Sequence, residues 1–171
     1  ELRDRALAYA GRYGAGATAS RLICGSMDCF AAVEEKLARL KQTESALIFN
    51  SGFQANVSII PALADRNTLI LSDHLNHNSI VQGAILARCS RKLFRHNDLA
   101  HLEMLLQEAA DSFERKIIIT ESVFSMDGDQ ADIDRLVALA TVYDAILIVD
   151  EAHATGVLGP GGMGLTVGKG V

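Results

Sequence analysis

The sequence predicts an α/β fold, with a mainly parallel β-sheet and helices on both of its faces. Short apolar or β-branched runs alternate with longer segments of helical pattern, as in repeated strand–helix units. Turn or capping residues bound each short run. Of the 171 residues, 49% are hydrophobic, which is enough apolar material for the core of one globular domain.

Five short runs are predicted to be strands because they are rich in the residues that suit a pleated, buried surface. They cover residues 46–50, 68–72, 92–95, 116–121 and 145–150. Four of these runs end next to polar residues. Since the carboxyl ends of parallel strands meet at one edge of a sheet, we expect those polar side chains to face one crevice.

Helices are predicted where apolar residues recur at intervals of three and four. One apolar face is formed by Phe30, Val33, Leu37 and Leu40, and another by Leu99, Leu102, Leu105 and Leu106. Asn97 and Asp98 are candidate caps for the second helix. Further helices are expected from residue 51 to about residue 61 and in the charged opening residues 1–5, whereas the glycine-rich segments 11–25 and 156–170 are expected to be loops.

Composition and charge disfavour several classes of protein. The net charge of −5 and the pI near 5.5 give no overall positive field for nucleic acid or an anionic membrane. No apolar run approaches the length of about 18 residues that a membrane span needs. The three cysteines form no C-x-x-C pair, which is typical of a reducing compartment. We therefore expect a cytoplasmic protein that binds neither nucleic acid nor membrane.

Asp150 ends the last predicted strand, and His153 follows it three residues later. An aspartate at such a strand end is partly buried, so it needs a cationic or protonated partner to offset its desolvation. A protonated pyridine nitrogen would be a suitable partner. The alternative is that Asp150 caps the following turn and that His153 is satisfied locally.

Ser51, Gly52 and Phe53 follow the first predicted strand and form the first turn of a helix. Free backbone N–H groups and the helix dipole favour an anion at that end, and glycine allows a close approach. A phosphate group could bind there, although a Ser-Gly turn is also common without any ligand.

His74 and His77 follow the second predicted strand, next to Asp73. The two histidines, with Asp73, could supply zinc ligands, but the further ligands needed to complete a site are not evident in the sequence. The interpretation that we prefer is that an imidazole lies flat against a planar cofactor ring.

Four segments, taken together and in this order, resemble the α-oxoamine synthases, which are fold-type I enzymes that depend on pyridoxal 5′-phosphate (PLP). The segments are residues 50–56 (NSGFQAN), 72–77 (SDHLNH), 121–128 (ESVFSMDG) and 150–156 (DEAHATG). The resemblance covers nearly the whole chain. It implies the large, cofactor-binding domain of that fold and a homodimer that condenses an amino acid with an acyl-CoA.

The resemblance also implies roles for individual residues. Asp150 would pair with the pyridine nitrogen, His153 would bind the phenolic oxygen, and His77 would stack on the ring. Around them, the phosphate and the rest of the cofactor would be lined by Ser51, Gly52, Phe53, Glu121 and Ser125. Arg21, in the glycine-rich loop, is a candidate for substrate binding.

Within the family, segment 19–25 resembles the glycine-rich loop of 8-amino-7-oxononanoate synthase or of glycine C-acetyltransferase. Segments 49–64 and 94–98 favour the 8-amino-7-oxononanoate synthases of biotin formation, with glycine C-acetyltransferase as the alternative. The family's Schiff-base lysine lies in a Ser-Lys motif after the Asp-x-x-His segment. Lys169 has no serine before it, so we expect residues 1–171 to be part of the large domain, without that lysine and inactive alone. The other hypothesis is a non-catalytic module that binds a partner.

Overall fold

The computed structural model describes residues 1–110 and 112–171, and it confirms the predicted α/β class. Within these residues, four parallel strands form one sheet in the order β2-β1-β3-β4. The strands are β1 (Thr68–Asp73), β2 (Ser90–Phe94), β3 (Arg115–Glu121) and β4 (Ala145–Asp150). Four of the five predicted strands are thus present, each within two residues of its expected limits.

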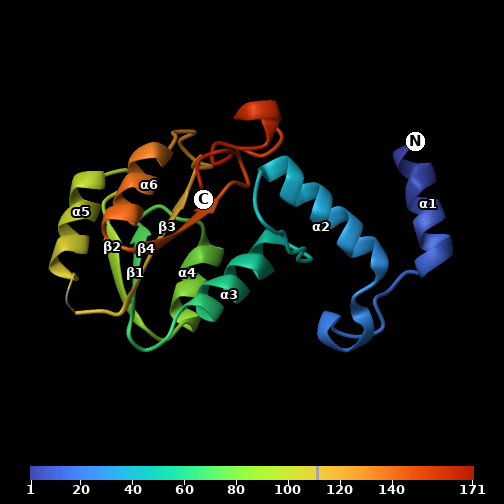
Figure 1. The fold of residues 1–171 in the computed structure, drawn as a ribbon, viewed down its shortest axis with the longest axis horizontal. Helices are drawn as coiled ribbons and strands as arrows, with labels where there is room; N and C mark the ends of the chain where they lie inside the picture. Colours follow the sequence, from blue (N-terminus) through green and yellow to red (C-terminus); the bar gives the residue numbers. More distant parts are fainter. Residues whose placement is uncertain (111) are drawn as a thin grey trace.

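Helices cover both faces of the sheet (Figure 1). On one face, α3 (Gly52–Leu63) and α4 (Asn78–Leu86) enclose a core that contains Ile60, Ile80 and Ile117. On the other face, α5 (Leu99–Glu108) and α6 (Ile133–Val142) pack their leucines against Leu69, Leu71 and Ile118 of the sheet.

The predicted apolar face of α5 is confirmed. Leu99, Leu102, Leu105 and Leu106 are all buried. Asp98 is the N-cap of this helix, because its Oδ1 accepts a hydrogen bond of 2.9 Å from the backbone N–H of His101. The capping residue therefore predicts where α5 begins, and the spacing of the leucines predicts which of its faces is buried.

The predicted strand at residues 46–50 is wrong. A strand needs a neighbouring backbone for its hydrogen bonds, and Ile48 uses side chains instead. Its N–H donates to Glu34 Oε1 (2.9 Å), and its carbonyl accepts from Arg21 (3.3 Å). The segment is irregular for this reason, although its composition suits a strand.

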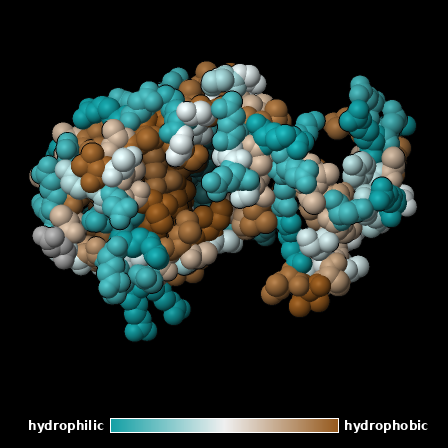
Figure 2. Space-filling view, viewed as in Figure 1, coloured by the Kyte–Doolittle hydropathy of each residue, from teal (hydrophilic) through white to brown (hydrophobic). Residues whose placement is uncertain are grey.

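The N-terminal part of the chain lies to one side of the sheet (Figure 1). It contains α1 (Leu2–Tyr13), the short π-helix η1 (Arg21–Gly25) and α2 (Asp28–Lys41). The charged helix at the start is therefore confirmed, but the loop expected over residues 11–25 is only partly present. Figure 2 shows a small apolar area at the lower end of this segment, where Leu22 and Ile23 of η1 are 92% and 75% exposed.

Lys41 connects α2 to the segment that follows β4. Its Nζ lies 2.9 Å from Glu151 Oε2, and the Glu151 carboxylate also accepts the backbone N–H groups of Leu165 and Thr166. Residues 156–170 are turns with one short 3-10 helix, η2 (Pro160–Gly162), as the glycine-rich composition predicts. None of the helices within the described residues has the length and apolarity to cross a bilayer.

Candidate active site

The carboxyl ends of β3 and β4 lie beside the N-terminal ends of α3 and α4. Glu121 and Asp150 are direct neighbours in the β3–β4 register, so two carboxylates end adjacent strands. A pocket of about 220 Å³ opens between these ends. It is lined by Gly52, Phe53, Asn56, His77, Ser79, Glu121, Asp150, Ala152 and His153. The expectation that polar strand ends share one crevice is confirmed for these residues.

The N-terminus of α3 forms one wall of the pocket. Ser51 is the N-cap, and its Oγ accepts the N–H of Gln54 at 3.2 Å. A Cβ added to Gly52 would meet no atom within 4 Å, so the space next to its backbone is open. The first-turn amides of Gly52 and Phe53 can therefore be approached by an anion.

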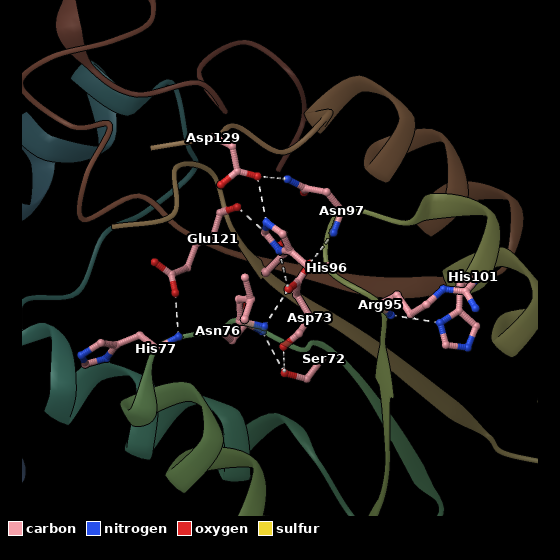
Figure 3. A network of polar contacts seen from close by, with 12 residues as sticks. Ser72, Asp73, Asn76, His77, Arg95, His96, Asn97, His101, Glu121 and Asp129 are labelled. Carbon is pink, nitrogen blue, oxygen red and sulfur yellow. Dashed lines mark hydrogen bonds and ion pairs between the residues drawn. The ribbon is translucent and has the colours of Figure 1, made fainter. Parts of the chain in front are cut away.

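The His77 side chain is fixed at the start of α4. It is the N-cap of this helix, because Nδ1 accepts the backbone N–H of Ser79 at 3.2 Å. The backbone N–H of His77 donates to Glu121 Oε1 at 2.6 Å, as Figure 3 shows. These bonds place the imidazole beside the end of β3.

Asp150 is held from two sides. Its Oδ1 accepts the backbone N–H of Ala152 (2.9 Å), and its Oδ2 accepts from Asn56 Nδ2 (2.8 Å). Asp150 thus caps the turn after β4, which was the alternative interpretation of this residue in the sequence. It also lines the pocket. Nothing in the sequence singled out Asn56 as its partner.

Burial raises the pKa of Glu121 above its usual value, and the nearby Asp150 carboxylate raises it further, against the hydrogen bond from His77. The Glu121 residue is only 5% exposed. A buried carboxylate next to a second carboxylate resists ionisation for both reasons. Glu121 is therefore the group of the pocket whose negative charge is least favourable in the folded chain.

We expect Glu121→Gln to stabilise the chain at pH 7. The raised pKa means that native Glu121 binds its proton more tightly than Glu121 in the unfolded chain. The free energy of unfolding therefore falls as the pH rises from the unfolded pKa of Glu121 through its native pKa. Glutamine keeps an oxygen for the His77 N–H and removes the charge. The melting temperature should rise by roughly 2 °C at pH 7, and the gain should disappear below about pH 4. Glu114→Gln, at an exposed position, is the control; equal melting temperatures for Glu121→Gln and wild type would contradict the effect.

The other predicted site residues lie at different distances from the pocket. His153 lines it and is exposed. Ser125 is in the exposed turn after β3 and is not among the lining residues. Arg21 is engaged elsewhere, because its guanidinium pairs with both Glu34 oxygens at 2.6 and 3.1 Å and lies 5.0 Å from the Phe30 ring. The structure does not bring these last two residues to the pocket.

A second polar cluster lies beside the pocket and was missed in the sequence. His96 bridges two carboxylates, with Nδ1 2.9 Å from Asp73 Oδ1 and Nε2 2.8 Å from Asp129 Oδ2 (Figure 3). The Phe124 ring contacts the imidazole edge-on, at 4.4 Å between centroids. His96 therefore connects the ends of β1 and β2 to the turn that follows β3. In the sequence, residues 94–98 stand out only by their resemblance to 8-amino-7-oxononanoate synthases.

Asp73 has no role in a metal site among the described residues. Its Oδ1 accepts the Leu75 N–H and its Oδ2 accepts the Asn97 N–H, both at 2.9 Å, and it is 1% exposed. No group of three or more His, Cys, Asp or Glu side chains in the described part of the chain is arranged to hold a metal ion. The stacking of His77 on a cofactor ring therefore stays a prediction.

We expect His96 to make stability depend on pH. Burial by itself would lower the His96 pKa, but the hydrogen bonds to Asp73 and Asp129 outweigh it, and the pKa is raised above 6.5. The native state therefore binds the proton more tightly, so the stabilisation is present below about pH 6.5 and is lost as pH rises through the native pKa. His96→Gln should cost about 2 kcal/mol at pH 6, from the loss of charge-assisted hydrogen bonds, and clearly less at pH 9.

Urea unfolding at both pH values measures this difference. The control is His74→Gln, because His74 is exposed. A His96→Gln cost that is the same at pH 6 and pH 9 would show that the bridge contributes no proton-linked stability.

The parallel sheet with helices on both of its faces matches the fold of PLP-dependent transferases. The family model described as "Aminotransferase class I and II" matches residues 3–167. The chain belongs to this family and, within it, to the PLP-dependent α-oxoamine synthases.

Curated relatives carry a more specific name. A "Putative 8-amino-7-oxononanoate synthase" of Desulfosudis oleivorans is 64% identical over 169 residues, which are 98% of this chain and 44% of the relative. A protein of the same name from Bordetella pertussis is 54% identical over 169 residues, covering 96% of this chain and 43% of the relative. The chain thus spans less than half the length of these relatives.

Solved structures share the fold. A serine palmitoyltransferase from S. paucimobilis, with bound PLP-myriocin aldimine, superposes with a TM-score of 0.88 at 32% identity, over 95% of this chain and 42% of that protein. The 8-amino-7-oxononanoate synthase of Francisella tularensis gives 0.77 at 28% identity, over 98% and 45%. PLP is the cofactor of this family.

Several groups of the pocket fit parts of PLP. Backbone donors at the open N-terminus of α3 suit its phosphate. Asp150, with both carboxylate oxygens oriented by hydrogen bonds, suits a protonated pyridine nitrogen. His77 also lines the pocket.

Proposed function

We propose that this chain forms the cofactor-binding part of a PLP-dependent acyltransferase that condenses an amino acid with an acyl-CoA, of the 8-amino-7-oxononanoate synthase kind. The observation that carries the proposal is the single pocket that unites Asp150, His77, His153 and the N-terminus of α3. The names of the curated relatives support the choice among α-oxoamine synthases.

Each side chain has a separate task in this proposal. When bound, PLP supplies the electron sink for breaking a bond at the amino-acid Cα. Asp150 holds the proton of the pyridine nitrogen, and His77 covers one face of the ring and excludes water from it. His153 donates to the phenolic oxygen. The first-turn amides of α3 hold the phosphate.

The Schiff-base lysine is not among the residues that line this pocket. Lys169 Nζ forms an ion pair with Asp134 on α6, the helix that packs on the opposite face of the sheet from α3 and α4. Lys41 is paired with Glu151. We propose that the lysine belongs to a part of the enzyme outside residues 1–171, and that these residues alone do not catalyse condensation.

Two titrations of the purified chain test the proposal. Pyridoxine 5′-phosphate, which has no aldehyde, should bind saturably, because the acid, the imidazole and the helix end are all present. PLP followed by borohydride and mass spectrometry should then leave Lys169 unmodified at one equivalent. Absence of saturable binding would contradict the cofactor site. Stoichiometric PLP on Lys169 would contradict the assignment of the lysine to another segment.

A further inference from the structure

Asn56 is the central donor of a hydrogen-bond chain behind the pocket. Its Nδ2 donates to Asp150 Oδ2 at 2.8 Å and to Ser79 Oγ at 2.9 Å, so both amide hydrogens are used. An ionised carboxylate can only accept. The Asn56 amide therefore has one permitted orientation, with its nitrogen towards Asp150.

Ser79 continues the chain to His77. It is 1% exposed, and its Oγ lies 2.7 Å from His77 Nδ1. The backbone N–H of Ser79 points to the same ring nitrogen at 3.2 Å. A backbone N–H can only donate, so Nδ1 must present its lone pair and the ring proton must be on Nε2. The Ser79 hydroxyl, which already accepts from Asn56, then donates to Nδ1 as well.

We propose that Asn56 and Ser79 are positioning residues, which hold His77 as the neutral Nε2–H tautomer and fix the plane of the Asp150 carboxylate. The donors run in one direction, from Asn56 through the Ser79 hydroxyl to His77, while the second amide hydrogen of Asn56 anchors Asp150. One side chain on α3 thus sets both the ring of His77 and the acid at the end of β4.

The Nε2–H tautomer of His77 would favour cofactor binding, an argument that rests on the proposed function. A pyridine ring protonated opposite Asp150 is cationic, and the face of a neutral imidazole attracts a cation whereas an imidazolium repels it. A proton on Nδ1 would also face the backbone N–H of Ser79, which can only donate. The same hydrogen bonds therefore favour the tautomer with its proton on Nε2 and restrict rotation of the ring.

Nuclear magnetic resonance of the ligand-free, ¹⁵N-labelled chain tests the hydrogen-bond chain directly. At pH 8, long-range ¹H–¹⁵N correlations of the His77 ring, assigned with His77→Gln, should show a proton on Nε2 and a bare, hydrogen-bonded Nδ1. In Ser79→Ala, the Nδ1 resonance should move towards that of an unbonded imine nitrogen. One Asn56 amide hydrogen should exchange with water about tenfold faster. Ser79→Thr, which restores a hydroxyl, should reverse both changes.

Ser58→Ala is the matched control, because Ser58 lies on α3 and is exposed; it should leave the His77 ring unchanged. A proton on Nδ1 in the wild-type chain would overturn the proposal. So would a Ser79→Ala spectrum in which neither the His77 nitrogen nor the Asn56 amide differs from wild type.

Binding of pyridoxine 5′-phosphate tests the positioning role. Asn56→Leu has a similar volume and no donor, and it should weaken binding about tenfold in a chain that keeps its circular dichroism spectrum. Wild-type affinity in Asn56→Leu would overturn the role, even with the expected His77 spectrum. If the wild-type chain shows that spectrum but binds no pyridoxine 5′-phosphate, the proposed function fails, and with it the role at the cofactor, while the tautomer assignment stands.

Discussion

Replacing Gly83 by alanine is expected to destabilise the chain by about 2 to 3 kcal/mol, through overpacking at the contact of α3 and α4. A Cβ on Gly83 would lie 2.6 Å from the backbone oxygen of Asn56 and 2.8 Å from Ile60 Cδ1. The Asn56 oxygen belongs to the α3 backbone and cannot rotate away. The two helices would have to separate, in a region where Ile60 and Ile80 are fully buried.

The sign of this effect distinguishes packing from helix propensity. In an exposed helix, Gly→Ala stabilises by up to about 1 kcal/mol because alanine loses less backbone entropy on folding. Gly11 on α1 is the matched control, since its Cβ would meet nothing within 4 Å. Chemical denaturation should show Gly11→Ala as neutral or stabilising and Gly83→Ala as destabilising. A stabilising Gly83→Ala would mean that α3 and α4 can separate at little cost.

Gly83 also matters for the site, because the atom that a Cβ would strike belongs to Asn56. Any shift of α3 relative to α4 changes the distance from Asn56 to Ser79, which stands on α4, and to Asp150 on β4. Close packing of two helices is therefore the structural condition for the hydrogen-bond chain behind the pocket.

Local signals in the sequence were sufficient for most of the fold. The leucine spacing of α5 and its cap at Asp98 depend on neighbours within a few residues, and both are confirmed. Residues 46–50 have the composition of a strand, but strand formation requires a partner backbone far away in the sequence. Composition cannot say whether that partner is present, and Glu34 and Arg21 take the hydrogen bonds of Ile48 instead.

The residues of the candidate site also fall into two groups, those that local patterns in the sequence indicate and those that only the structure reveals. Asp150 and His77 could be found because Asp150 ends β4 and His77 lies in the short turn after β1, at the edge where parallel strands end. The His96 bridge unites residues 23 and 33 positions away in the sequence, and Asn56 reaches Asp150 across 94 positions. Such pairs arise from the order of strands and the packing of helices, which no local pattern contains.

Asp150→Asn is expected to weaken binding of pyridoxine 5′-phosphate by about thirtyfold, or about 2 kcal/mol. The substitution keeps the shape of the side chain but removes the negative charge that, in the proposed function, faces the pyridine nitrogen. It also disturbs the side chain's own support. Asp150 accepts from Ala152 on one oxygen and from Asn56 on the other, whereas asparagine has one oxygen, so one of these donors would face an NH₂ group.

Fluorescence titration of the wild-type and variant chains measures the change, with Asp144→Asn as the control. Asp144 is exposed and has a φ of 49°, a conformation that asparagine tolerates, so its substitution should alter neither folding nor binding. Loss of affinity in Asp150→Asn with an unchanged circular dichroism spectrum would show that the Asp150 carboxylate contributes to binding in the folded chain. Equal affinity in both variants would mean that the ring binds without the acid, and the phosphate site at α3 would then account for the binding.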